Sequence, residues 1–184
     1  DKGRAILIDE AMPWLDTAKL APSTAIKVTA RDGLVLDAFV TLPRTPGPHP
    51  LVLMPHGGPI GVADRRHFDP EVQLMASLGY AVLQVNFRGS AGYGDAWYGR
   101  NGFKAWDVAI GDVNDAGRWL VSEGIAAPDK LAIVGWSYGG YAALQSQVLD
   151  PALFKAVVAI APVTDLGFLI ADARDYTNSR LVRD

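Results

Sequence analysis

The chain has 184 residues, of which 49% are hydrophobic and 20% charged, a composition typical of a soluble globular domain with a substantial core. Its net charge of −3 gives no electrostatic attraction to nucleic acid or to an anionic membrane surface, and its apolar runs are too short to cross a bilayer. The absence of cysteine excludes disulfides, thiol catalysis and cysteine metal sites, and it leaves the compartment (cytoplasmic, periplasmic or secreted) open.

The first part of the chain predicts a lead-in followed by a β-hairpin. Residues 1–24 lack sustained periodicity and are interpreted as a linker with at most one short strand. Residues 26–30 and 34–42 alternate between apolar and polar, are rich in β-branched side chains and are separated by a turn, which is typical of a hairpin. A proline-rich surface loop is expected over residues 43–50.

After this loop, short apolar strands alternate with helices. The expected strands are 51–55, 80–87, 131–136 and 155–161, and the expected helices are 69–78, 104–123 and 138–149, with a glycine-rich loop over 88–102. Buried strands joined by helical crossovers form parallel sheets that are covered on both faces. The sequence therefore predicts an α/β fold with a mostly parallel sheet and helices on both faces.

The segment Gly135-Trp136-Ser137-Tyr138-Gly139 has the form G-x-S-x-G and lies between a predicted strand and a predicted helix. In that context the serine occupies a strained turn, its hydroxyl projects from the sheet edge, and the helix N-terminus faces the charge that develops on the substrate. We therefore predict that Ser137 is a catalytic nucleophile. The alternative is that a glycine–serine turn joins the strand to the helix without any catalytic role.

The segment His56-Gly57-Gly58-Pro59 directly follows the strand 51–55. A loop at this place can supply one backbone N–H to an oxyanion hole, and the residue after the nucleophile, Tyr138, supplies the other. His56 itself is not expected to be the base, because in this type of fold the catalytic histidine follows the serine in sequence. The alternative for His56 is a hydrogen-bonding prop within a simple turn.

Two other groups of polar residues are interpreted as structural. Arg88 opens the glycine-rich loop and is expected to pair with Asp112 or Asp115 of the following helix, which anchors the loop. His67 with Asp64 and Asp69 forms a loose set of potential metal ligands, but the spacing fits no ligand template. We therefore expect no metal and no cofactor.

Taken in order, GWSYGGY (135–141), HGGP (56–59) and NFRGSAGYG (86–94) make the chain similar to the catalytic domain of the prolyl oligopeptidase family of serine peptidases. It most resembles the acylaminoacyl-peptidase and dipeptidyl-peptidase branches, and the resemblance extends from residue 13 to residue 166. It implies an α/β-hydrolase fold acting on short peptides. It also implies that residues 1–24 lead from an upstream β-propeller and that residues 25–184 are the first part of the hydrolase domain.

The resemblance also implies roles for individual residues. Ser137 would be the nucleophile, the N–H groups of Gly58 and Tyr138 would form the oxyanion hole, and Tyr138 with Val163 would line the pocket for the residue before the scissile bond. At Leu166 and Leu169, members of the dipeptidyl-peptidase type carry aromatic rings, so a strict preference for proline is not implied.

Two catalytic groups of the family are missing from these residues. No histidine follows Ser137, and Asp165, Asp172 and Asp175 lie too close behind it to be the usual acid. We therefore expect a truncated hydrolase, without its C-terminal strands and two of its three triad members, that has almost no activity alone. Strand 155–161 would then be an unpaired sheet edge.

Three functions remain open at the level of the sequence. The first is a serine peptidase that forms an acyl-enzyme on Ser137. The second is a carboxylesterase on the same scaffold, because the elbow and the oxyanion hole serve either acyl group. The third is a non-catalytic, hydrolase-like binding module. The sequence indicates neither the oligomeric state nor the particular peptide substrate.

Overall fold

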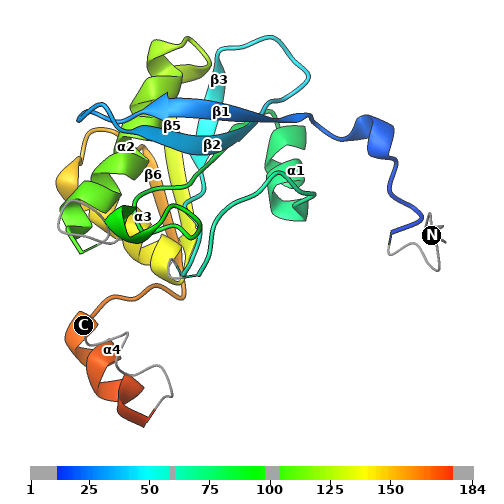
Figure 1. The fold of residues 1–184 in the computed structure, drawn as a ribbon. Helices are drawn as coiled ribbons and strands as arrows, with labels where there is room; N and C mark the ends of the chain where they lie inside the picture. Colours follow the sequence, from blue (N-terminus) through cyan, green and yellow to red (C-terminus); the bar gives the residue numbers. More distant parts are fainter. Residues whose placement is uncertain (1–11, 59–60, 98–103, 176–184) are drawn as a thin grey trace, which may run out of the picture.

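The computed structural model describes residues 12–58, 61–97 and 104–175 (Figure 1). In this part of the chain six strands form one sheet in the order β1-β2-β4-β3-β5-β6. The strands are β1 (Ser23–Thr29), β2 (Val35–Thr41), β3 (His49–Leu53), β4 (Ala81–Val85), β5 (Ala126–Trp136) and β6 (Ala156–Ile160). The pairs β1–β2 and β2–β4 are antiparallel and the other three are parallel. The predicted mostly parallel sheet is thus confirmed.

Helices lie on both faces of this sheet. They are α1 (Pro70–Ser77), α2 (Trp106–Ser122), α3 (Tyr138–Leu149) and α4 (Leu166–Asp172), with short 3₁₀ turns η1 (Thr17–Lys19), η2 (Asp95–Trp97) and η3 (Ala173–Asp175). α2 and α3 pack side by side against β5, whereas α1 packs against β4 and β2 on the other face. α4 lies apart from this body of sheet and helices (Figure 1).

The helix ends follow from local chemistry. Asp69 accepts hydrogen bonds from the N–H groups of Glu71 and Val72 at 2.9 and 3.1 Å and so caps the start of α1. Gly79 then turns the chain away after the helix with φ 93°, a conformation that favours glycine. Both boundaries agree with the predicted helix 69–78.

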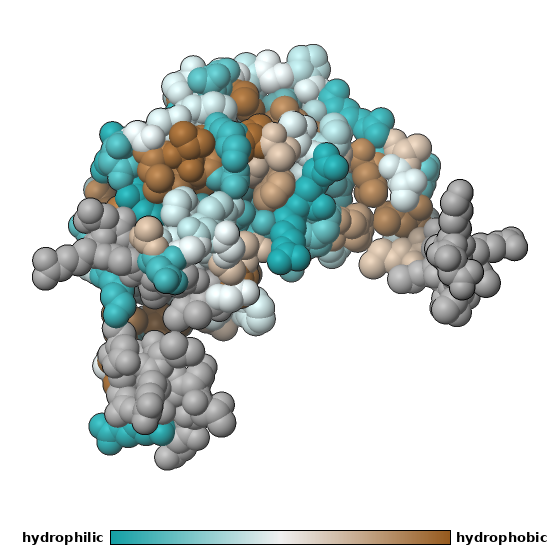
Figure 2. All heavy atoms as spheres, in the orientation of Figure 1, coloured by the Kyte–Doolittle hydropathy of each residue, from teal (hydrophilic) through white to brown (hydrophobic). Residues whose placement is uncertain are grey.

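The core lies between the sheet and α2. All five residues of β4 are buried, as expected for a strand covered on both faces. One apolar face of α2, formed by Val113, Ala116 and Leu120, packs into the same cluster as Leu53, Leu83 and Ile133 of the strands. Outside this core, hydrophilic residues cover much of the face drawn in Figure 2 and apolar residues gather in separate patches.

Three strands begin earlier than predicted. β3 starts at His49 rather than at residue 51. β5 starts at Ala126 rather than at residue 131, because its first residue pairs with His49 before the register shifts and the main pairing with β3 begins. β1 starts at Ser23, so the predicted domain boundary after residue 24 falls inside a strand that pairs with β2. Ala126 has a low strand propensity of its own and is paired here by the neighbouring strand.

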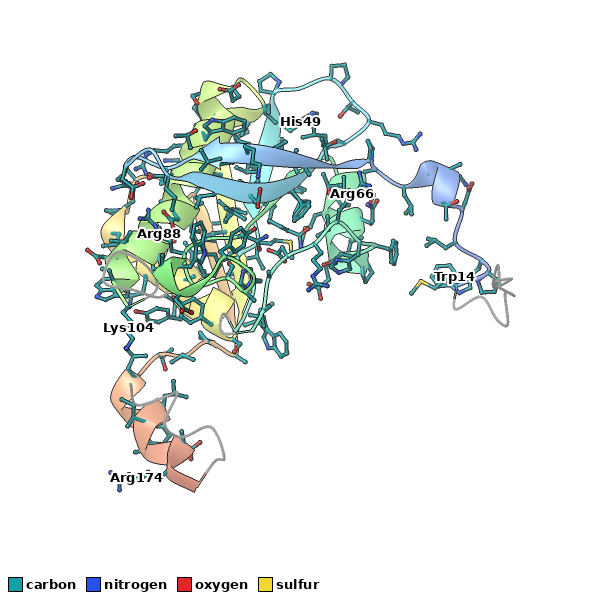
Figure 3. All side chains as sticks on the ribbon, in the orientation of Figure 1. Trp14, His49, Arg66, Arg88, Lys104 and Arg174 are labelled. Atoms are coloured by element: carbon teal, nitrogen blue, oxygen red, sulfur yellow. The ribbon has the colours of Figure 1, made fainter. Side chains whose placement is uncertain are left out.

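The segment before β1 is attached to the domain by hydrogen bonds. The backbone of Ala21 exchanges two of them with the side chain of Gln73 on α1, at 2.8 and 3.0 Å. Arg44 donates to the carbonyl groups of Ala18 and Leu20. Trp14, by contrast, is 77% exposed and lies away from the sheet (Figure 3).

β6 is the outermost strand of the described sheet on its parallel side. Val158 and Ile160 on this strand are 45% and 50% exposed. The apolar edge expected for strand 155–161 is therefore present among the described residues.

Candidate active site

Ser137 stands at the corner between β5 and α3, as the single residue that joins them. Its φ of 57° and ψ of −121° lie in a region that costs a non-glycine residue about 1–3 kcal/mol. Neighbouring backbone holds the corner: the N–H of Ser137 donates to the Ile160 carbonyl at 3.0 Å, and its carbonyl accepts from Tyr141 at 3.1 Å. This is the strained strand-to-helix turn expected of a G-x-S-x-G segment.

The two glycines of the motif permit contacts that no side chain would allow. A Cβ on Gly135 would lie 1.9 Å from the carbonyl oxygen of Gly139, far inside the contact limit. A Cβ on Gly139 would lie 2.2 Å from the carbonyl oxygen of Pro55, which directly precedes the His56 loop. The start of α3 is thereby packed against the segment that follows β3.

The loop after β3 therefore lies beside the serine corner. A Cβ on Gly57 would come within 3.3 Å of the Trp136 carbonyl oxygen and 3.7 Å of the Ser137 Cβ. Gly58 is exposed and has φ 100°, a conformation suited to glycine. The N–H groups of Gly58 and Tyr138, predicted to be oxyanion donors, thus belong to two adjacent segments, and the Ser137 side chain makes no capping bond to α3.

His56 is held by partners other than Ser137. Its Nδ1 is 2.7 Å from the carbonyl oxygen of Gly57, its Nε2 is 2.8 Å from the Ser90 Oγ, and its ring stacks on Phe87 with centroids 4.6 Å apart. Burial lowers the pKa of His56, so the ring is neutral near pH 7. Because both nitrogens are engaged, His56 is not placed to act as the base for Ser137, in agreement with the prediction.

The other two histidines are also placed elsewhere. His49 is buried at the start of β3, the end of the strand opposite to the HGGP segment. His67 lies in an exposed loop, where its Nδ1 is 2.8 Å from the Arg65 carbonyl oxygen. None of the three histidines, all of which are described, is hydrogen-bonded to Ser137.

The predicted pocket residues Tyr138 and Val163 do come together. Both pack against a small cluster of buried residues, Ile110, Tyr141 and Ala142. The ring of Tyr138 also lies between Phe87 and Tyr141, with centroid distances of 6.0 and 5.4 Å, and burial raises its pKa. An apolar wall is therefore built directly beside the serine corner.

Leu166 and Leu169 do not join this wall among the described residues. Both are on α4, with 54% and 36% of their surface exposed, and α4 stands away from the body of the domain (Figure 1). That these two leucines speak against a strict preference for proline stays a prediction.

Arg88 anchors the glycine-rich loop through a buried ion pair. Its side chain donates to Asp112 at 2.5 and 2.8 Å, and its backbone N–H donates to the same carboxylate at 3.0 Å. Asp32 of the β1–β2 turn accepts a further hydrogen bond from Arg88 at 2.6 Å. Of the two partners that the sequence predicts, Asp112 is the one observed, whereas Asp115 pairs with Arg31 at 2.7 Å.

Three of these contacts were not predicted from the sequence. They are the bond from Arg88 to its second carboxylate, Asp32, the ion pair between Arg31 and Asp115, and the hydrogen bond from Ser90 to His56. The two partners of each pair are 34 to 84 positions apart in the chain. No short motif predicts such a pairing. The one available signal is that Ser90 lies within NFRGSAGYG, a segment on which the family resemblance rests.

Asp64, His67 and Asp69 have separate surroundings. Asp69 caps α1, and Asp64 lines a hollow of about 530 Å³ together with Asp37, Asn86 and Tyr93. Polar contacts link these residues: Asn86 Nδ2 donates to the Asp64 carbonyl and to the Tyr93 hydroxyl, both at 3.1 Å, and Tyr93 donates to Asp37 at 2.9 Å. Within residues 12–58, 61–97 and 104–175, no three acidic or histidine side chains are arranged as metal ligands.

Burial, with a smaller effect of the Asp69 charge, raises the pKa of Asp64 from 3.8 to about 7. The folded protein thus binds this proton more tightly than the unfolded chain does. The contribution of the bound proton to the free energy of unfolding is therefore complete below about pH 4 and is lost as the pH rises from there through 7. Asp64→Asn stays neutral at every pH. We measure the free energy of unfolding of both proteins by urea at pH 5 and pH 8. The difference between them should change by about 2–3 kcal/mol in favour of Asp64→Asn on going from pH 5 to pH 8.

The control for Asp64→Asn is Asp129→Asn, which removes one charge from an exposed position before the main part of β5. We expect the control to change stability equally at both pH values. If the stability change caused by Asp64→Asn depended on pH no more than that caused by Asp129→Asn, the raised pKa of Asp64 would be contradicted.

None of the helices in the described part of the chain has the length and apolarity of a membrane span.

The chain is similar in sequence to a known protein family and to individual peptidases. The model of a family described as "Prolyl oligopeptidase family" matches residues 66–182. Dipeptidyl aminopeptidase BIII of Pseudoxanthomonas mexicana is 37% identical over 175 residues, which is 90% of this chain and 25% of that protein. Dipeptidyl peptidase family member 6 of Caenorhabditis elegans is 30% identical over 196 residues, 94% of this chain and 26% of that protein.

The fold also matches solved structures. A puromycin-hydrolysing peptidase of Mycobacterium tuberculosis superimposes with a TM-score of 0.81 and 29% identity, covering 92% of this chain and 26% of that one. The chain spans about a quarter of the length of the relatives that it matches. The family match, the α/β-hydrolase arrangement and the serine corner agree: this chain belongs to the prolyl oligopeptidase family of serine peptidases.

Proposed function

We propose that the whole protein is a serine peptidase that hydrolyses short peptides through an acyl-enzyme on Ser137. The observation that carries this proposal is the strained backbone of Ser137, held by its neighbours beside the Gly57–Gly58 loop. A strained corner costs stability, and such strain typically persists where it serves a site. The names of the relatives, dipeptidyl peptidases among them, favour peptides over esters as substrates.

The chemistry follows from the positions of the groups. The Ser137 Oγ attacks the carbonyl carbon, its proton passes to a base and then to the leaving amine, and water later releases the acyl group by the reverse sequence. The N–H groups of Gly58 and Tyr138 stabilise the negative oxygen of the tetrahedral intermediates. Each such donor contributes on the order of 3–4 kcal/mol to transition-state stabilisation.

The base is proposed to be a histidine, oriented by an aspartate, from the part of the whole protein outside these 184 residues. His56 is engaged at both nitrogens, and His49 and His67 lie elsewhere. Residues 1–24 are proposed to lead from an upstream propeller-like domain. The attachment of Ala21 to α1 by hydrogen bonds is compatible with such a connection.

Tyr138 and Val163 are proposed to form the wall that receives the side chain before the scissile bond. This wall is apolar, and the Tyr138 ring is fixed between two other aromatic rings. We therefore propose that the substrate presents an apolar or small residue at this position.

The function is tested with the whole protein and two chromogenic substrates. We expect it to hydrolyse a dipeptidyl p-nitroanilide, with a kcat/KM of at least about 10⁴ M⁻¹s⁻¹ as for ordinary enzymes. Turnover of p-nitrophenyl esters without any cleavage of the anilide would instead indicate a carboxylesterase. No turnover of either substrate, in protein that is folded by circular dichroism, would favour a binding module.

The 184-residue chain alone is expected to be almost inactive on the same anilide. Without a base, only the oxyanion donors and substrate binding remain, which supply roughly 10³–10⁴-fold acceleration over water. Comparison of the chain with the whole protein at equal concentration checks this expectation. Equal kcat/KM for the two would show that the base lies within these residues.

A further inference from the structure

We propose that Ser90 is a positioning residue for the oxyanion hole and acts through His56; this inference rests on the proposed function. Ser90 is completely buried in the glycine-rich loop after β4, and its hydroxyl oxygen lies 2.8 Å from His56 Nε2. The other ring nitrogen lies 2.7 Å from the Gly57 carbonyl oxygen. A continuous path of hydrogen bonds therefore leads from Ser90 to the loop beside Ser137.

The chemistry of the partners determines where the protons are. The Gly57 carbonyl can only accept, so His56 Nδ1 must carry the proton. The ring is neutral because burial lowers its pKa, so Nε2 has a lone pair and can only accept. The hydroxyl of Ser90 must then be the donor to Nε2. The Gly57 carbonyl thereby selects the imidazole tautomer, and Ser90 holds the ring in place by donating to its free nitrogen.

Holding that carbonyl fixes the direction of the Gly58 N–H. The two groups belong to one planar trans peptide and point in opposite directions from it. Neither glycine has a side chain that could fix this peptide, and Gly58 is exposed. His56 is the side chain bonded to the peptide, so its orientation sets where the proposed oxyanion donor points.

Ser90 is itself held rigidly enough for this role. Its N–H donates to the Phe87 carbonyl at 3.0 Å, and Arg88, two positions earlier in the chain, is held by Asp112 and Asp32. The Phe87 ring, also fully buried, stacks on the His56 ring at an interplanar angle of 19°. The imidazole is thus fixed at its face by Phe87 and at its edge by Ser90.

The first test is Ser90→Ala in the whole protein, with Ser146→Ala as the matched control. Ser146 is also completely buried, but its hydroxyl has no hydrogen-bond partner in the described part of the chain. We expect Ser90→Ala to lower kcat by roughly 10–100-fold, with KM changed less than about twofold. Affinity for a peptide aldehyde, which forms a tetrahedral adduct, should fall by the same factor as kcat/KM. Ser146→Ala should change neither.

The second test asks whether Ser90 acts through His56. In a double-mutant cycle, Ser90→Ala should have little further effect once His56→Ala is present, because the path is already broken. Selective ¹⁵N labelling of histidine should show His56 protonated at Nδ1 in the unmodified protein. In Ser90→Ala the Nε2 resonance should shift, because that nitrogen loses its hydrogen bond from Ser90.

Independent, additive effects of the two substitutions, or a His56 protonated at Nε2, would overturn the proposal. So would a loss of activity in Ser90→Ala that Ser146→Ala matches. Reaction of the unmodified protein with a fluorophosphonate is measured in parallel. If it reacts at Ser137 but Ser90→Ala retains full activity, only this inference fails, whereas a protein that does not react overturns the proposed function as well.

Discussion

Ser137→Ala in the whole protein is expected to lower kcat for a peptide anilide by about 10⁴–10⁶-fold. The substitution removes the oxygen that would form the acyl-enzyme and leaves the proposed oxyanion donors of Gly58 and Tyr138 in place. KM should change little, because the apolar wall of Tyr138 and Val163 is untouched. Stability should change by less than about 1 kcal/mol, since alanine occupies the same strained backbone without a lost hydrogen bond.

The measurement is steady-state kinetics, with a mock purification from cells that lack the protein as the control for contaminating peptidase. Ser146→Ala, on the same helix α3, should retain full activity and so excludes a general effect of serine removal. Retention of more than about 1% of kcat by Ser137→Ala would contradict a nucleophilic role for this residue.

Arg88→Met is expected to destabilise the folded protein by about 3–5 kcal/mol. The substitution keeps the bulk of the side chain but removes the two guanidinium hydrogen bonds to the Asp112 carboxylate, which is 1% exposed. The hydrogen bond from the backbone N–H of residue 88 is unaffected. Urea unfolding at pH 7 measures the loss.

Two further variants show whether the cost comes from the buried charge. Arg31→Met breaks an ion pair in which the arginine is 65% exposed, and it should cost about 1 kcal/mol or less. Adding Asp112→Leu to Arg88→Met removes the unpaired charge and should recover much of the lost stability. A cost for Arg88→Met no larger than for Arg31→Met would show that the pair is not a main anchor of the glycine-rich loop.

Much of the fold was predictable because its strands and helices have strong local signals. The largely apolar strands β3 and β4 and the amphipathic helix α2 follow from hydrophobic pattern alone, and Asp69 and Gly79 mark the two ends of α1. The early start of β5 at Ala126 was not predictable in this way. Its first residues lack a strand pattern and pair only because β3 lies beside them.

In the candidate site, too, some features could be predicted from local sequence and others could not. The corner at Ser137 was predictable, since a serine between two glycines at a strand-to-helix junction implies a backbone conformation. The role of Ser90 was not, because a serine in a glycine-rich loop is compatible with many contacts. Only the three-dimensional path from Ser90 through His56 to Gly57 shows which contact is made.

The most direct measurement for the central claim is covalent labelling of the whole protein with a fluorophosphonate, followed by peptide mass spectrometry. This reagent transfers a phosphonyl group to a serine whose hydroxyl is activated and faces an oxyanion hole. We expect a single adduct on the peptide that contains Ser137, and none in the Ser137→Ala variant. An adduct on another residue, or no adduct while a known serine hydrolase in the same tube is labelled, would contradict the assignment of Ser137 as the nucleophile.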